Sequence, residues 1–284
     1  MAQSKLPGPL CRFLGALEID AGTLCRQASP LPGVVNHAHQ PTQHRRRKRH
    51  QQAKSAKVPA RAAGTSKTSS SEAAAQQLKA AKVFAPAATS KISPAEFEAA
   101  AQQLGGGIPV ALLRAFAEVE SGGKSGFGPM GLPVIAYEGH WFRKFTHKVY
   151  DVTHPFLSYP YVKKAGPEWV HNNKDQVTAW KTLEEALALN HDAALKSCSW
   201  GMFQVMGFNY ASCGYKTVDD FVAAMKAGEA GQLLAFVGFC KANPACLEAM
   251  RKKDFKGMAI GYNGPDYGDY DKRIEKAYKK YGGT

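Results

Sequence analysis

The stretch IPVALLRAFAEVESGG occupies residues 108–123 and sets the expectation for the fold. A proline near its start and two glycines at its end are typical helix boundaries. Between them, apolar residues recur at the spacing of one helix face. That inward face is continued by a glutamate, and it consists of Leu113, Phe116, Ala117 and Glu120. The sequence therefore predicts a helix over residues 108–121 that ends with a carboxyl group turned toward the interior.

The chemistry expected at Glu120 follows from its place at the last turn of this helix. Burial raises the pKa of a carboxyl group, and the negative end of the helix dipole raises it further. A glycosidase needs an acid that still holds its proton near neutral pH. The alternative is a helix-terminal glutamate that reaches solvent past the two glycines. Glu118 falls about 200° away around the helix and is expected on the outer face.

Further helices are predicted on both sides of this stretch. Ser93, Pro94 and Glu96 form a capping pattern that begins a helix over residues 95–104. Thr182 and Glu185 give a second capping box. The later helices are predicted at residues 182–195, 217–227, 230–242, 245–263 in pieces, and 270–281. The segment 128–170 is rich in Pro, Gly, Tyr and Phe and predicts a short strand pair and loops around residues 133–137. The fold class expected is mostly α, with a small irregular or β insert.

Charge divides the 284-residue chain into unequal parts. Residues 1–92 hold 15 Lys and Arg against three Asp and Glu, whereas the other 192 hold 22 against 20. Residues 1–70 show no apolar periodicity and are expected to be a disordered basic leader. Residues 71–92 are expected to be a linker with a partial helix duplication, because EAAAQQL occurs at 72–78 and again at 98–104. The folded domain is expected over residues 93–284.

The remaining composition argues against several classes of protein. No apolar run approaches the ~20 residues of a membrane span, and no signal-peptide core is present. The cysteine spacing fits neither a metal pattern nor a dense disulfide framework, so free thiols are expected at Cys11, Cys25, Cys198, Cys213, Cys240 and Cys246. The leader's four histidines are irregularly spaced, and we expect no metal and no cofactor.

Three motifs in order carry a resemblance to a known family. They are AEVESGG at 117–123, SWGMFQVMG at 199–207 and AIGYNGPDY at 259–267. Together they resemble the N-acetylmuramidase endolysins of bacteriophages, which share a lysozyme-like fold with goose-type lysozymes and soluble lytic transglycosylases. The similarity covers roughly residues 93–281 and implies a lysozyme-like helical domain.

The resemblance implies roles for the residues in these motifs. Glu120 would be the general acid. Other residues would line the sugar groove or face the acid across it, and these are Gly201, Phe203, Gln204, Tyr262 and Asn263. The chemistry agrees, since glycine allows close backbone approach and amide groups bond sugar hydroxyls. For Phe203, as for Trp200, Val205 and Met206, ordinary core packing is the favoured alternative.

A fourth element at residues 136–142, AYEGHWF, resembles the segment that follows the catalytic helix in this family. It implies that Glu138 is the second carboxylate, which positions water or stabilises an oxocarbenium-like transition state. Tyr137 and His140 would contact substrate. Gly139 replaces the basic residue expected there and puts those contacts in doubt. The alternative is that Glu138 is a structural carboxylate that pairs with His140.

The function implied is that of a glycoside hydrolase of bacterial peptidoglycan, cleaving the β-1,4 bond between N-acetylmuramic acid and N-acetylglucosamine. As a phage endolysin it would be a monomer that collects in the host cytoplasm before lysis and then acts on the periplasmic cell wall, although delivery by a virion is an alternative. One rival is a lytic transglycosylase, which uses the muramic 6-hydroxyl in place of water. Another is a structural or nucleic-acid-binding virion protein acting through the run of basic residues at 45–49, which could also contact anionic envelope phosphates.

Overall fold

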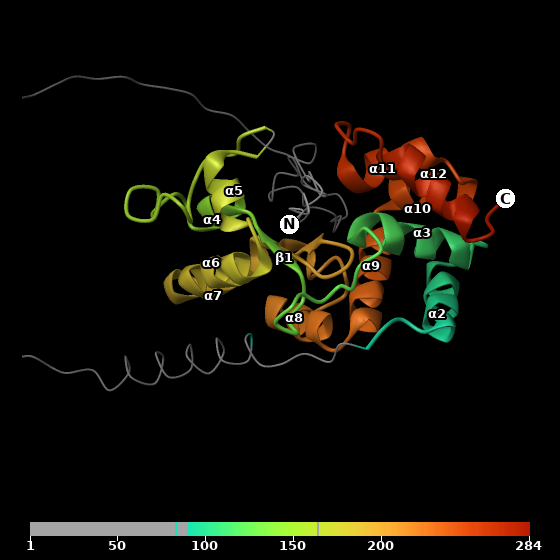
Figure 1. Cartoon of the computed structure of the whole chain (residues 1–284), viewed down its shortest axis with the longest axis horizontal. Coiled ribbons are helices and arrows are strands. Elements are labelled where there is room, and N and C mark those ends of the chain that lie inside the picture. The colour runs from blue at the N-terminus through green and yellow to red at the C-terminus, as the bar shows by residue number, and fades with distance from the viewer. Residues whose placement is uncertain (1–82, 84–89, 164) are drawn as a thin grey trace, which may run out of the picture. The chain divides into compact units, whose positions relative to one another are not determined.

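The computed structural model describes Val83, residues 90–163 and residues 165–284. The expectations for the leader at residues 1–70 and for most of the linker at 71–92 lie outside these residues. The described part is mostly helical and contains one small antiparallel sheet (Figure 1). This confirms the predicted fold class.

Helix α2 (Pro94–Leu104) forms where its capping residues predict it, and α3 (Val110–Ser121) forms between the predicted proline and glycine boundaries. The Ser93 hydroxyl accepts a hydrogen bond from the amide of Glu96, and the Glu96 carboxylate accepts one from the amide of Ser93. This reciprocal pair satisfies two amides that have no partner within the helix. Helix α3 ends at Gly122, whose φ of 61° lies in the left-handed region that favours glycine.

The helices from residue 176 onward lie near the predicted positions with one error, whereas the helices at residues 139–145 and 167–172 were not predicted and fall in or at the end of the segment expected to hold strands and loops. The helices that follow α3 are α4 (Gly139–Phe145), α5 (Pro167–Asn172), α6 (Gln176–Leu189), α7 (His191–Lys196), α8 (Val218–Lys226), α9 (Glu229–Ala242), α10 (Pro244–Lys252), α11 (Phe255–Asn263) and α12 (Tyr270–Lys280). The single helix expected over residues 182–195 is wrong. The cap is Asp175 rather than Thr182, and Asn190 ends α6 and caps α7. Thr182 is buried within α6, where it caps nothing.

The sheet consists of β1 (Ile135–Tyr137), β2 (Cys198–Trp200) and β3 (Val205–Met206), in that order and antiparallel throughout. The expected strand pair within residues 128–170 is therefore wrong, because β1 pairs with a strand from the distant second motif. Side-chain amides cover the other edge of β1. Gln176 bonds both backbone groups of Ile135, and Asn173 bonds both of Tyr137. These amides take the place of a further strand.

Helix α3 lies within the hydrophobic core and packs against α2 and α12 (Figure 1). Phe116 of α3 contacts the rings of Phe236 and Tyr262. Trp200 of β2 is fully buried against Trp180. The four described cysteines are free thiols, as predicted, and they are Cys198, Cys213, Cys240 and Cys246.

No single described helix is long and apolar enough to cross a membrane. Helices α9 and α10 reach the required length and composition only as a pair, and the pair is bent by 100°.

Candidate active site

Glu120 lies at the end of α3 with 3% of its surface exposed. The Tyr270 hydroxyl donates a hydrogen bond to Oε1. The other carboxyl oxygen, Oε2, has no hydrogen-bond partner. Burial raises the pKa of Glu120 to about 8, although the bond from Tyr270 and the positive charge of Arg273 act in the opposite direction. Glu120 is therefore a neutral carboxylic acid at pH 7 and can donate a proton.

The neighbouring glutamate on the same helix is in a different environment. Glu118 accepts hydrogen bonds from Lys280 Nζ at 2.7 Å and from the Tyr281 hydroxyl at 2.6 Å. These bonds lower the pKa of Glu118. At neutral pH Glu118 is therefore charged and Glu120 is neutral, although they lie on the same turn. This agrees with the sequence prediction that Glu118 lies on the outer face of the helix and Glu120 on the inward face.

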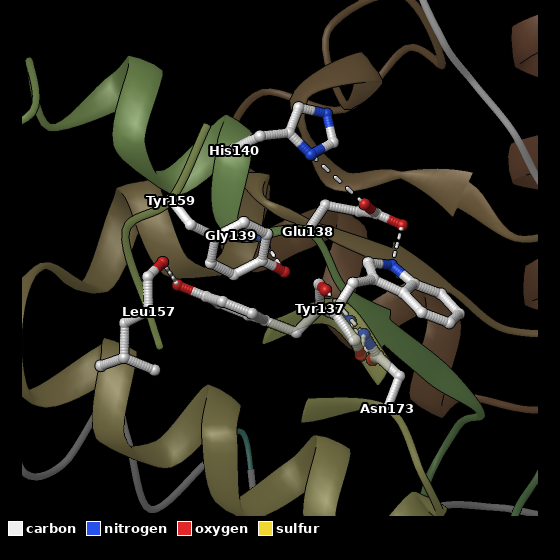
Figure 2. A network of polar contacts seen from close by, with 8 residues as sticks. Tyr137, Glu138, Gly139, His140, Leu157, Tyr159 and Asn173 are labelled. Carbon is white, nitrogen blue, oxygen red and sulfur yellow. Dashed lines mark hydrogen bonds and ion pairs between the residues drawn. The ribbon is translucent and has the colours of Figure 1, made fainter. Parts of the chain in front are cut away.

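Glu138 directly precedes α4 and belongs to a second polar network (Figure 2). Its Oε1 accepts a hydrogen bond of 2.9 Å from the Trp169 indole, and its Oε2 lies 3.4 Å from Nδ1 of His140. Burial raises the pKa of Glu138 to about 8 and lowers that of His140 to about 4, to which Lys144 adds repulsion. At neutral pH Glu138 therefore keeps its proton and His140 is a neutral imidazole, so the pair carries no net charge.

The residues on either side of Glu138 are structural supports. The Tyr137 ring is fully buried, and its hydroxyl donates to the backbone carbonyl of Leu157 at 2.9 Å (Figure 2). In this structure Tyr137 therefore supports the loop at Leu157, and its contact with substrate stays a prediction. A Cβ on Gly139 would lie 2.1 Å from the ring of Tyr159. Any larger residue at position 139, including the expected basic one, would collide with Tyr159, which packs against the backbone there.

The turn between β2 and β3 shapes the site from within. Gly201 has a φ of 69°, and a Cβ there would meet the Gln232 side chain at 2.5 Å. The Gln232 amide oxygen accepts a bond of 2.6 Å from the amide of Met202. Gly201 is thus needed for an internal contact, whereas the sequence suggested close approach of a ligand. The Gln204 amide bonds Ser199 and the carbonyl of Gly201, so it too is held within the turn.

Phe203 belongs to the core beneath this turn. Its ring is fully buried and stacks on Phe236 with ring centres 4.6 Å apart. This is the packing that the core alternative predicts, and the groove contact of Phe203 stays a prediction. Trp200, Val205 and Met206 are buried as that alternative predicts.

The third motif connects this turn to the acid. The Tyr262 hydroxyl donates to the Phe203 carbonyl at 2.5 Å, and its ring stacks on Tyr270 at 6.1 Å. Asn263 follows as a buried residue at the end of α11. A continuous set of contacts therefore runs from Glu120 through Tyr270, Tyr262 and the β2–β3 turn to the sheet. Strand β1 of that sheet leads directly into Glu138.

Sequence reasoning missed Tyr270, Arg273 and Trp169, which contact or surround the two glutamates. A signal for Tyr270 was present, because the buried face of α12 consists of Tyr270, Ile274, Ala277 and Tyr278. This is the spacing of an inward helix face. A tyrosine at the start of such a face needs a partner for its hydroxyl. No comparable pattern marks Trp169.

Within the described residues, no group of three or more His, Cys, Asp or Glu side chains could hold a metal ion. The chemistry that these residues offer is proton transfer. A helical domain that keeps a buried glutamate protonated has the site of a glycosidase, whose acid must hold its proton until the glycosidic bond breaks.

The comparisons with known proteins agree with this class. The N-acetylmuramidase family matches residues 109–282, so the chain belongs to that family and is a glycoside hydrolase of peptidoglycan. The crystal structure of the Burkholderia AP3 phage endolysin is similar to the chain, at 31% sequence identity and a TM-score of 0.58. The match covers 74% of this chain and 86% of that one. No curated protein matches the chain in sequence.

Proposed function

We propose that the chain is a phage endolysin in which Glu120 is the general acid for cleavage of the β-1,4 bond between N-acetylmuramic acid and N-acetylglucosamine. The observation that carries this assignment is the state of Glu120, which is buried, protonated at neutral pH and bonded through one oxygen only. The likeness to a phage endolysin supports the role in lysis. The protein would be made in the host cytoplasm and act on the cell wall once the membrane opens.

The proposed reaction begins with transfer of the proton from Glu120 to the glycosidic oxygen. The bond from that oxygen to the anomeric carbon of N-acetylmuramic acid breaks, and N-acetylglucosamine leaves with a neutral hydroxyl. Water then adds its oxygen to the anomeric carbon, and one water proton restores the acid form of Glu120. The net result is the addition of one water molecule across the bond.

Glu138 is proposed to position the attacking water together with His140. The Trp169 indole fixes one carboxyl oxygen of Glu138, so only the side that faces His140 remains to contact water. Because Glu138 holds its proton at pH 7, it is a poor general base and a better orienting group.

We expect Glu138→Gln to lower the rate of hydrolysis by about 10²-fold, the scale of a misplaced reactant, and less than loss of the acid does. Initial rates on purified peptidoglycan measure this effect. His171→Gln is a matched control, because His171 lies beside Phe156 and outside this network. A Glu138→Gln rate equal to wild type would remove Glu138 from the mechanism.

Product analysis tests the proposed use of water. Mass spectrometry of the fragments released from purified peptidoglycan should show reducing N-acetylmuramic acid ends. Reaction in H₂¹⁸O should place the heavy oxygen at those ends. Anhydro ends, which are lighter by one water and contain no ¹⁸O, would instead identify a lytic transglycosylase.

A further inference from the structure

We propose that Tyr270 is the positioning residue of the catalytic acid: its hydroxyl holds Oε1 of Glu120, so that Oε2 carries the proton and presents it to the glycosidic oxygen. This inference rests on the proposed role of Glu120 and adds a residue outside the three motifs of the sequence analysis. It also specifies which of the two oxygens reacts.

The position of Tyr270 is fixed by its surroundings. It is the first residue of α12, and 3% of its surface is exposed. Its ring stacks on Tyr262 with an angle of 15° between the planes, and it contacts Phe116 of α3 at 6.4 Å. Because α12 packs along α3, the ring cannot turn away without disturbing the core. The hydroxyl is therefore held at one place beside the end of α3.

The two oxygens of Glu120 differ because of this contact. A neutral carboxyl group has one oxygen that only accepts hydrogen bonds and one that carries the proton. The Tyr270 hydroxyl donates to Oε1, which makes Oε1 the accepting oxygen. The proton then belongs to Oε2, the buried oxygen without a partner. A buried polar group is ordinarily satisfied, and the glycosidic oxygen of a bound glycan would supply the missing acceptor.

Tyr270 also acts on the charge that develops during the reaction. As the proton leaves Oε2, Glu120 becomes a carboxylate, and a hydrogen bond from a hydroxyl to a carboxylate is stronger than one to a neutral acid. The bond is thus worth more in the transition state than before it. Structural support alone would not have this property.

Other polar and charged groups adjoin the acid from α3, α11 and α12. Arg273, one turn further along α12, donates to the Val119 carbonyl at 2.9 Å, and its charge favours the ionised form of Glu120. Tyr262 of α11 stacks on Tyr270 and donates to Phe203. Glu118 of α3 pairs with Lys280 and Tyr281 on the outer face. Removing the Tyr270 hydroxyl would leave Arg273 as the group that still favours ionisation.

The experiment is Tyr270→Phe, which removes the hydroxyl and keeps the ring. We expect kcat on soluble glycan strands to fall roughly 10- to 100-fold, the scale of one hydrogen bond to a charged group, with little change in KM. The basic limb of the pH profile of kcat/KM should move to higher pH, because the lost bond lowers the pKa of Glu120 in the wild type. Tyr278→Phe is the matched control, since Tyr278 is buried on the same helix and donates to Thr284 instead. Its pH profile should not move.

The outcomes separate this inference from the proposed function. Activity in Glu120→Gln at the wild-type level would overturn both. If Glu120→Gln is inactive but the basic limb of the Tyr270→Phe pH profile stays at the wild-type pH, only the role of Tyr270 is overturned. Thermal unfolding measures how much folded Tyr270→Phe protein remains. If activity falls only as far as the folded fraction does, and the basic limb does not move, Tyr270 is a structural residue and the inference is contradicted.

Discussion

Glu120→Gln is expected to lower peptidoglycan hydrolysis by about 10²- to 10⁴-fold, the usual contribution of a general acid. Glutamine has the same shape and can accept the hydrogen bond from Tyr270, but its amide does not donate a proton to a glycosidic oxygen. Because the wild-type carboxyl is neutral at pH 7, the neutral amide should fit its buried site. Clearing of purified cell walls, measured as a loss of turbidity, gives the rate.

The matched control is Glu118→Gln. Glu118 lies on the same helix two residues earlier and faces Lys280 and Tyr281. Its replacement should leave the rate within about twofold of wild type, because a partly exposed ion pair contributes little. Equal rates for Glu120→Gln and Glu118→Gln would contradict the assignment of the acid.

Stability should fall as pH rises from 6.5 to 8. A carboxyl whose pKa is raised in the folded state holds a proton that the unfolded chain has already lost, so unfolding becomes easier as pH increases toward the folded pKa. Glu120 and Glu138, both with a pKa of about 8, act in this direction. Each of the two carboxyl groups should lower the free energy of unfolding by roughly 2 kcal/mol across this window, because a difference of one pH unit corresponds to about 1.4 kcal/mol. Thermal or urea unfolding at a series of pH values measures the decline.

Below pH 6.5, His140 changes the stability in the opposite direction. Its pKa is lowered to about 4, so its contribution to stability is complete above 6.5 and is lost as pH falls toward 4. Glu120→Gln should remove about half of the decline between pH 6.5 and 8 and should be more stable than wild type at pH 8. A variant that declines as steeply as wild type would mean that Glu120 titrates normally.

The parts of the fold that local sequence controls could be predicted. The Ser93 cap and the inward face of α3 depend on residues within a few positions of one another. Such patterns predict helices from sequence because the hydrogen bonds of a helix join residues that are close along the chain. Even there, Thr182 and Glu185 matched a capping box inside α6, since a pattern of polar residues does not show which residue is buried.

The parts that depend on distant contacts could not be predicted. Pairing of β1 with β2 joins segments that are about 60 residues apart, and the edge amides of Gln176 and Asn173 come from elsewhere again. The site shows the same division. Glu120 was found because its environment follows from its own helix. The buried state of Phe203, the Gln232 contact at Gly201 and the Tyr270 bond all depend on packing against other elements.

The most direct test of the central claim is the pKa of Glu120 itself. Carbon-detected NMR titration of protein labelled at glutamate carboxyls would follow each carboxyl resonance from pH 3 to 10. One resonance, absent from Glu120→Gln, should titrate near pH 8, well above the ordinary glutamate value of 4.5. If the resonance missing from the variant instead titrates near 4.5, the carboxyl is charged at neutral pH and cannot be the acid proposed.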